Sequence, residues 1–274
     1  MNTLKVILML ASLTGLLILI GYGIGRGKGM VIALILAFLM NIGGYWFSDS
    51  IVLRMYNAQP VTGSEAPALY DAVASLSAKA KIPAPKVYVI PNDAPNAFAT
   101  GRNENHAAVA VTSGILKMLT RDELEGVLAH ELSHIKHKDI LISTLAATVA
   151  SAVVLLSRWA VIFGGDEGST ISAIAVAVIA PIAATLIQMA ISRSREYEAD
   201  AGSAGITGRP EALAGALAKL SHAARTKPMS ANPATAHMFI VNPLSGGTIV
   251  NLFSTHPPLE KRIERLMKMK ADAG

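Results

Sequence analysis

At residues 130–134 the chain reads His-Glu-Leu-Ser-His. Residues four apart lie one above the other on a helix face, so both imidazoles can reach a single metal ion. The intervening Glu131 would then stand beside a metal-bound water, where a carboxylate can take up a proton. The pattern predicts a metal site that activates water, and the surrounding sequence must supply the helix and a further ligand.

The residues around the motif carry the signals of a half-buried helix. Thr120-Arg-Asp-Glu123 has the spacing of a capping box, in which the Thr hydroxyl and the Glu carboxylate each satisfy a backbone N–H. An apolar stripe follows, made by Leu124, Val127, Leu128, Leu132 and Ile135. Charged residues at 136, 138 and 139 end the polar portion just before a long apolar segment. We therefore expect the motif on a helix at a membrane boundary.

Composition indicates an integral membrane protein. Of the 274 residues, 52% are hydrophobic and only 16% are charged, and the mean hydropathy is +0.45. The net charge of +5 is modest, and no basic cluster is interleaved with aromatic residues, which argues against nucleic-acid binding. Cysteine is absent, so disulfides and thiolate ligands are excluded and any metal must be held by His, Glu or Asp.

Four apolar segments approach the roughly 20 residues that cross a bilayer core. They span about residues 4–24, 30–47, 140–163 and 171–191. We expect a first transmembrane hairpin at 1–47 that is kept as an uncleaved anchor, and a second at 140–191. The second hairpin is rich in Ala, Ser and Thr and contains Pro181, so packing partly within protein is the alternative to spanning.

The two hairpins divide the polar part into residues 48–139, with the paired histidines, and residues 192–274. With four spans, both polar parts lie on one side of the membrane. Lys and Arg near the span ends favour the cytoplasmic side for them, although Arg26 and Lys28 in the first hairpin's turn oppose this orientation.

Further elements can be placed within the polar parts. Ser64–Pro67 resembles a helix start, and residues 86–90 are typical of a strand. Residues 97–100 and 107–111 are predicted to form two strands joined by a turn at 101–105, and a final helix is expected at 259–269. The predicted fold class is an α+β integral membrane protein. It combines four hydrophobic helices with a mainly helical, zincin-like domain that holds a small β-sheet.

A third metal ligand is needed, and two candidates follow from spacing. His137 lies close to His130 around the helix but two turns further along it, too far for three rings to converge easily. Glu196 and Asp200 are four apart after the fourth apolar segment, so one helix face offers a ligand carboxylate and a second carboxylate that can orient a ligand imidazole. Glu198 points away from that face. Glu196 is therefore the favoured third ligand.

Four motifs together resemble the HtpX family of bacterial membrane-bound zinc metalloproteases, which are related to the CAAX prenyl proteases. They are Asn96-Ala-Phe-Ala-Thr-Gly101, His130-Glu-Leu-Ser-His134, Glu196-Tyr-Glu-Ala-Asp200 and Thr255-His-Pro-Pro258. They occur in the family's order, with two apolar segments before the first motif and two between the second and third. The resemblance covers essentially the whole chain.

The resemblance implies one Zn²⁺ per chain, held by His130, His134 and Glu196, with Glu131 as general base and Asp200 as an outer acidic residue. It makes His256 a donor to the developing oxyanion, for which Tyr197 is a weaker rival. The alternative for His256 is a turn residue ahead of the final helix. The stretch Asn96, Ala97, Phe98 and Ala99 would be a substrate-binding edge strand, or else a purely structural hairpin strand.

The resemblance also implies a cellular role. It predicts an endopeptidase of the bacterial inner (cytoplasmic) membrane that cleaves misfolded or damaged membrane proteins on the cytoplasmic side, in stress and quality control. Its partners would be unfolded polypeptides and the lipid bilayer. One rival is an intramembrane protease of the site-two type, which the charges flanking the motif disfavour. Another is a non-enzymatic scaffold with a structural metal site, which would not need Glu131.

Overall fold

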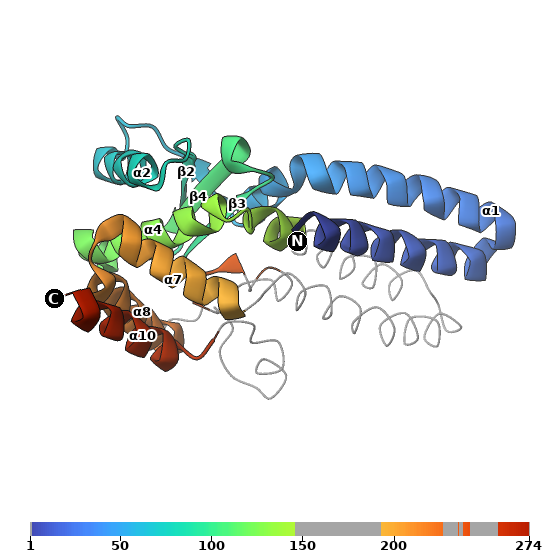
Figure 1. Cartoon of the computed structure of the whole chain (residues 1–274). Helices are drawn as coiled ribbons and strands as arrows, with labels where there is room; N and C mark the ends of the chain where they lie inside the picture. Colours follow the sequence, from blue (N-terminus) through green and yellow to red (C-terminus); the bar gives the residue numbers. More distant parts are fainter. Residues whose placement is uncertain (1, 146–192, 227–234, 236–237, 242–256, 274) are drawn as a thin grey trace.

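The computed structural model describes residues 2–145, 193–226, 235, 238–241 and 257–273. These residues form a long helical hairpin and a mixed domain at its base (Figure 1). Residues 146–192, which hold most of the second predicted hairpin, lie outside the described residues, as does His256.

The hairpin is formed by α1 (Asn2–Met55), whose chain reverses at Arg26, a residue with a φ of +47°. Its two arms lie side by side and antiparallel (Figure 1). A hydrogen bond of 2.9 Å joins them, donated by Asn41 Nδ2 on the second arm to Thr14 Oγ1 on the first. Helix continues eight residues past Phe47, the last residue of the second apolar segment. In the described part of the chain, the stretch Arg26–Phe47 is long and apolar enough to cross a membrane.

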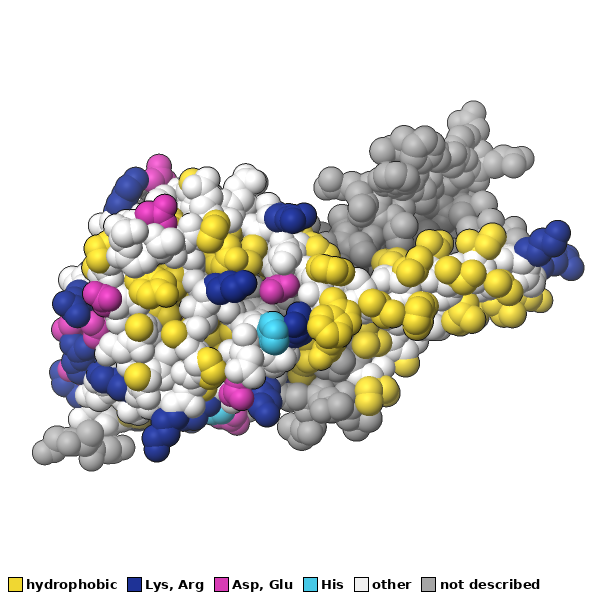
Figure 2. Space-filling view, turned by 90° about the horizontal axis from the view of Figure 1, so that it is seen from above, with side chains coloured by type: hydrophobic (Ala, Val, Ile, Leu, Met, Phe, Trp, Pro, Cys, Tyr) yellow, Lys and Arg dark blue, Asp and Glu magenta, His cyan; other side chains and the backbone are white. Residues whose placement is uncertain are grey.

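Apolar side chains cover the outside of this hairpin (Figure 2). Phe38 is 62% exposed and Phe47 61%, and their neighbours Val31, Ile32, Ile35 and Leu39 are also more than half exposed. In water such a surface would be costly, since burying apolar area contributes about 25 cal/mol per Å². The hairpin therefore presents a surface suited to an apolar environment.

The small sheet has the order β1-β2-β4-β3. Its strands are β1 (Gln59–Pro60), β2 (Lys86–Ile90), β3 (Ala97–Gly101) and β4 (Ala107–Thr112). β2, β3 and β4 lie where the sequence indicated strands, whereas β1 was not predicted. β3 pairs with β4 in antiparallel register, Ala99 opposite Val109. The parallel pairing of β2 with β4 has no signal in the sequence. β3 is left at the edge of the sheet.

The central helix is α4 (Arg121–Lys136), which begins with the predicted capping box. Thr120 Oγ1 accepts from the Glu123 N–H, and the Glu123 carboxylate accepts from the Thr120 N–H at 2.8 Å. The apolar stripe of α4 is fully buried except at Leu124, which is partly buried. Because it is covered on several sides, α4 is the helix around which the domain is built.

Four helices pack on α4 or on each other around it (Figure 1). They are α2 (Pro67–Ala80), α7 (Arg193–Thr207), α8 (Pro210–Thr226) and α10 (Leu259–Ala273), and a short helix, α3 (Ser113–Met118), follows β4. The helix start indicated at residues 64–67 is confirmed, since α2 begins at Pro67 with the proline in its first turn, although no side chain caps it. The predicted end of the final helix was wrong, because α10 continues four residues beyond 269.

Close contact between α4 and α7 depends on a glycine. A Cβ at Gly202 of α7 would lie 2.4 Å from Ser133 Oγ and 2.9 Å from Ser133 Cβ of α4. Ser203 Oγ, one residue on, donates to the Gly126 carbonyl of α4 at 2.8 Å. Small side chains thus allow the two helices to approach closely enough for their ligand residues to meet.

An aromatic cluster joins the base of α1 to the domain. The Phe239 ring is 5.0 Å from that of Tyr56 and 5.2 Å from that of Phe98, both in edge-on arrangements. Phe98 and Phe239 are fully buried. The cluster fixes the end of the hairpin next to β3, and so determines where the domain lies relative to the apolar surface.

Candidate metal centre

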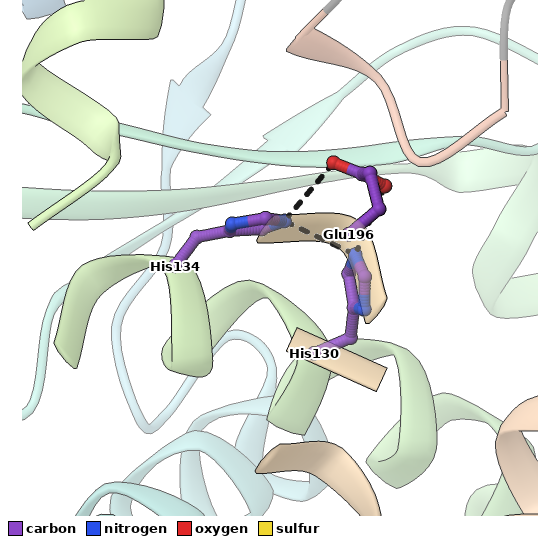
Figure 3. A group of neighbouring side chains, drawn as sticks. All are labelled: His130, His134 and Glu196. Carbon is purple, nitrogen blue, oxygen red and sulfur yellow. Dashed lines mark hydrogen bonds and ion pairs between the residues drawn. The ribbon is translucent and has the colours of Figure 1, made fainter. Parts of the chain in front are cut away.

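Three predicted ligands converge at the α4–α7 interface (Figure 3). His130 Nε2 and His134 Nε2 are 3.2 Å apart, and Glu196 Oε1 lies 3.5 Å from His134 Nε2. The other oxygen, Glu196 Oε2, is 3.9 Å from His130 Nε2. Ligands at about 2.05 Å from a tetrahedral zinc would stand about 3.3 Å from one another. The three side chains therefore have the spacing of a tetrahedral site with one position left over.

Each imidazole has a carboxylate behind it. His130 Nδ1 lies 3.0 Å from Asp200 Oδ1, and His134 Nδ1 lies 3.5 Å from Asp139 Oδ2. A carboxylate at the far ring nitrogen fixes the tautomer, so that the other nitrogen faces the metal. Asp200 was expected in this position. The role of Asp139 was missed, because the sequence indicated only the end of the polar helix there, and its position two residues after His137 gave no distinct signal.

Each outer carboxylate is also paired with an arginine. Arg195 Nη1 donates to Asp139 Oδ1 at 3.2 Å. Arg262 donates twice to Asp200, from Nε at 2.9 Å and from Nη2 at 2.7 Å. Arg262 was not identified from the sequence, although it was detectable. It falls on the apolar stripe of α10 with Leu259, Ile263 and Leu266, where an arginine is out of place unless it has a buried partner.

The two histidines of the candidate site have opposite electrostatic surroundings in the metal-free protein. Burial, with the nearby charges of Arg262 and His134, lowers the pKa of His130 to about 4 despite Asp200. Burial alone would also lower the pKa of His134, but Asp139, Glu196 and Glu131 raise it to about 9. The pair thus holds one proton at neutral pH. A metal ion must displace that proton to bind both rings.

Glu131 is buried beside the ligands, with 3% of its surface exposed. Burial, reinforced by the charge of Glu196, raises its pKa to about 7, while the His134 charge and a hydrogen bond from the Ala99 N–H oppose that rise. A carboxyl group with a pKa near the operating pH can both accept and release a proton. The hydrogen bond also places this carboxylate at the middle of the edge strand β3.

The start of the predicted substrate strand holds another part of the chain. Asn96, 4% exposed, donates from Nδ2 to the Val241 carbonyl at 2.9 Å. The Ala97 carbonyl accepts from the Ile240 N–H at 3.1 Å. Phe98 points into the aromatic cluster. Of residues 96–99, therefore, Ala99 is the one whose backbone N–H faces the Glu131 carboxylate.

Other candidates lie apart from the ligand cluster. His137 is the C-terminal cap residue of α4 and is not among the converging ligands. The Tyr197 ring lies under the Arg265 guanidinium at 4.1 Å, and Glu198 is exposed, as its helical angle predicted. His256 lies outside the described residues.

The donor set fits a zinc ion. Two imidazole nitrogens and one carboxylate oxygen form a common three-residue ligand set of catalytic zinc, and a fourth position is open for water. Both imidazoles have an outer carboxylate, one of the usual partners of a zinc-bound histidine.

A helix with paired histidines, a carboxylate beside them and a third ligand from a separate helix define a metal-dependent hydrolase of the HExxH type. The chain belongs to Peptidase family M48, whose model matches residues 64–270, and it is a metallopeptidase.

Similar proteins share one name, and the chain matches each of them over nearly its full length. The chain is 54% identical to a "Protease HtpX homolog" of Desulforapulum autotrophicum, covering 100% of this chain and 91% of the relative. It is 55% identical to proteins of the same name from Syntrophobacter fumaroxidans, covering 95% and 97%, and Pyrococcus furiosus, covering 97% and 96%. The predicted resemblance is thereby confirmed.

A solved structure supports the fold. The crystal structure of S. mikatae Ste24p matches with a TM-score of 0.54 at 17% identity, over 97% of this chain. The chain spans 65% of the length of that protein. At this identity the match concerns the arrangement of the elements alone.

Proposed function

We propose that the chain is a membrane-anchored, zinc-dependent endopeptidase that hydrolyses peptide bonds of misfolded or damaged membrane proteins. One observation carries the proposal: His130, His134 and Glu196 converge while the Glu131 carboxylate lies buried beside them, next to the sheet edge. A structural metal site needs ligands but no such base. The arrangement is suited to moving a proton during hydrolysis.

Zinc, when bound, supplies a Lewis acid for the scissile carbonyl and lowers the pKa of a coordinated water. The chain's own residues do the remaining work. Asp200 and Asp139 keep the two imidazoles oriented, and Glu131 takes a proton from the attacking water and delivers it to the departing amine. His256 is proposed as a donor to the developing oxyanion, from the segment that precedes α10.

A substrate is proposed to bind as an added strand along β3. Backbone hydrogen bonding of this kind tolerates many sequences, which suits a protease for unfolded chains. Since Asn96 and Ala97 already bind residues 240 and 241, we assign them to holding that segment. Thr100 and Gly101 hydrogen-bond to Thr144, so Ala99, beside Glu131, is the part of the edge that we assign to the substrate.

The membrane setting is proposed from the apolar hairpin. The exposed apolar side chains of α1 and the span-length stretch Arg26–Phe47 support an anchor in the bacterial inner membrane. The second hairpin at 140–191 and the cytoplasmic side of the catalytic domain complete the proposal. Both rest on the sequence, on its apolar segments and on the placing of its Lys and Arg residues.

The geometry disfavours an intramembrane protease of the site-two type. The motif helix α4 has 16 residues, begins with a charged capping box and is covered by α2, α7 and α8. A helix of this kind lies in a water-soluble domain rather than in the bilayer core, which needs about 20 apolar residues.

The chemistry can be tested with Glu131→Gln in detergent-solubilised protein. We expect the variant to keep its zinc and to lose at least 100-fold in cleavage rate of an unfolded polypeptide, because general acid–base catalysis contributes 10²–10⁴-fold. Glu198→Gln, which changes an exposed carboxylate on α7, serves as the control and should cleave normally. Equal cleavage rates in the parent and in Glu131→Gln would contradict the assignment of Glu131 as the general base.

The substrate class can be tested in liposomes that contain the protease and a membrane protein. We expect a destabilised variant of that substrate to be cleaved at internal peptide bonds, while its stable parent stays intact. Cleavage of both at the same rate, or release of terminal residues alone, would contradict the proposed role.

A further inference from the structure

The largest fully buried side chain in the described residues is a charged one, Arg262 of α10, with 0% of its surface exposed. Burying a guanidinium is expensive unless hydrogen bonds and opposite charges compensate. The acceptors and negative charges around Arg262 therefore indicate the role of this residue.

Every nitrogen of Arg262 faces the ligand cluster or its support. Nε donates to Asp200 Oδ2 at 2.9 Å, and Nη2 donates to Asp200 Oδ1 at 2.7 Å. Nη1 lies 3.4 Å from Glu196 Oε2 and donates to the Ile240 carbonyl at 3.3 Å. Nη2 is also 3.4 Å from the ring nitrogens of His130. One side chain from the last helix thus contacts two of the three ligands and the carboxylate behind one of them.

The fork of the guanidinium is essential to this pattern. A planar group with five donors can hold one carboxylate with two bonds and still reach a second acceptor and a backbone carbonyl. A lysine ammonium has the same charge but is a single point and cannot reach all of these acceptors at once. Full burial also keeps Arg262 away from any substrate, so it is a positioning residue and not a catalytic one.

We propose that Arg262 positions Glu196 and Asp200 for metal binding, so that the site is completed only when α10 docks on α7. The inference rests on the proposed zinc site. The carboxylate of Glu196 is held toward the two imidazoles, and Asp200 is held at the far nitrogen of His130. Residues more than 60 positions apart in sequence are thereby joined in one site.

The test compares the zinc affinities of the parent and of Arg262 variants. Each is the full-length chain in detergent, and the affinity is measured by competition with a chromophoric chelator. Loss of an outer partner of a metal ligand costs 10–100-fold in affinity. Arg262→Lys keeps the buried charge and is expected to bind zinc at least 10-fold more weakly than the parent. Arg262→Gln is expected to bind more weakly still, and Arg262→Lys carries the test if Arg262→Gln does not fold.

Arg265→Gln provides the matched control. It removes a contact between the same two helices, the stacking of Arg265 on Tyr197 at 4.1 Å, without touching a carboxylate of the site. Its zinc affinity should equal that of the parent. The visible absorption of bound Co²⁺, which reports ligand geometry, should change in Arg262→Lys and stay unchanged in Arg265→Gln.

The outcomes separate the inference from the proposed function. A parent chain that binds no zinc would overturn the proposed function and this inference with it. A parent that binds one zinc, together with a folded Arg262→Lys of equal affinity and an unaltered Co²⁺ spectrum, would overturn the inference alone. Equal losses in Arg265→Gln would also overturn it, because the effect would then come from the helix contact in general.

Discussion

The substitution Gly202→Ala tests how closely α7 must approach α4. The added Cβ would meet Ser133 Oγ at 2.4 Å and Ser133 Cβ at 2.9 Å, whereas ordinary contact begins at 3.4 Å. Relief requires about 1.0 Å (3.4 − 2.4) if the hydroxyl stays in place and about 0.5 Å (3.4 − 2.9) if it rotates away. The backbones of α4 and α7 must therefore separate by at least about 0.5 Å, because the Cβ of Ser133 cannot rotate away as its hydroxyl can.

Such a shift should harm the metal site more than the fold. Overpacking of this kind costs about 1–3 kcal/mol of stability. Metal–ligand distances are specified to about 0.2 Å, and Glu196 is on the same helix as Gly202. We therefore expect Gly202→Ala to unfold at a lower temperature and to lose most of its zinc affinity and peptidase activity.

The assay is thermal unfolding together with zinc competition, with two further variants. Gly205→Ala, on the same helix but facing open space, should bind zinc normally and gain up to about 1 kcal/mol from helix propensity. Ser133→Gly, which removes both clashing atoms, should restore zinc affinity to Gly202→Ala. Parental affinity and stability in Gly202→Ala would refute the argument that this contact sets the ligand spacing.

Three further predictions concern other parts of the domain. Burial alone would raise the pKa of Glu123, but hydrogen bonds from Lys219 and the helix cap lower it below 4.5. The stabilisation by Glu123 is therefore present at neutral pH and lost as the pH falls through this lowered pKa. Glu123→Gln should lower stability in thermal unfolding by about 0.5 kcal/mol at pH 7, with a difference that shrinks as the pH falls below 4.5, and a difference that stays constant on acidification would contradict this. Phe239→Ala should destabilise the domain by about 3–5 kcal/mol in denaturant unfolding because it empties the middle of the aromatic cluster, and a loss below 1 kcal/mol would mean that the cluster does not fix the hairpin. Asp139→Asn should weaken zinc binding about 10-fold by releasing His134, and unchanged affinity would show that this carboxylate does not orient the ring.

Much of the site could be predicted from local spacing. A helix repeats every 3.6 residues, so the positions of His130 and His134, and of Glu196 and Asp200, already place each pair on one face. The capping box and the strands were equally local signals. In each case the information needed lies within a few residues of sequence.

What could not be predicted depends on contacts between distant segments. The parallel pairing of β2 with β4 and the pairing of Ile240 with Ala97 join stretches without any shared pattern. Arg262 could have been noticed as a charge on an apolar stripe, but its partners, Asp200 and Glu196, lie more than 60 residues away in the sequence. Burial of such groups is decided by the whole packing arrangement, which spacing alone does not reveal.

The most direct measurement is the zinc bound to purified protein in three forms: the parent, Glu196→Gln and Glu198→Gln. Glu196 and Glu198 are two residues apart on α7, but one faces the imidazoles and the other faces solvent. We predict one zinc per chain in the parent and in Glu198→Gln, with little or none in Glu196→Gln. Full zinc occupancy in Glu196→Gln, or no zinc in the parent, would contradict the assignment of this cluster as the metal centre.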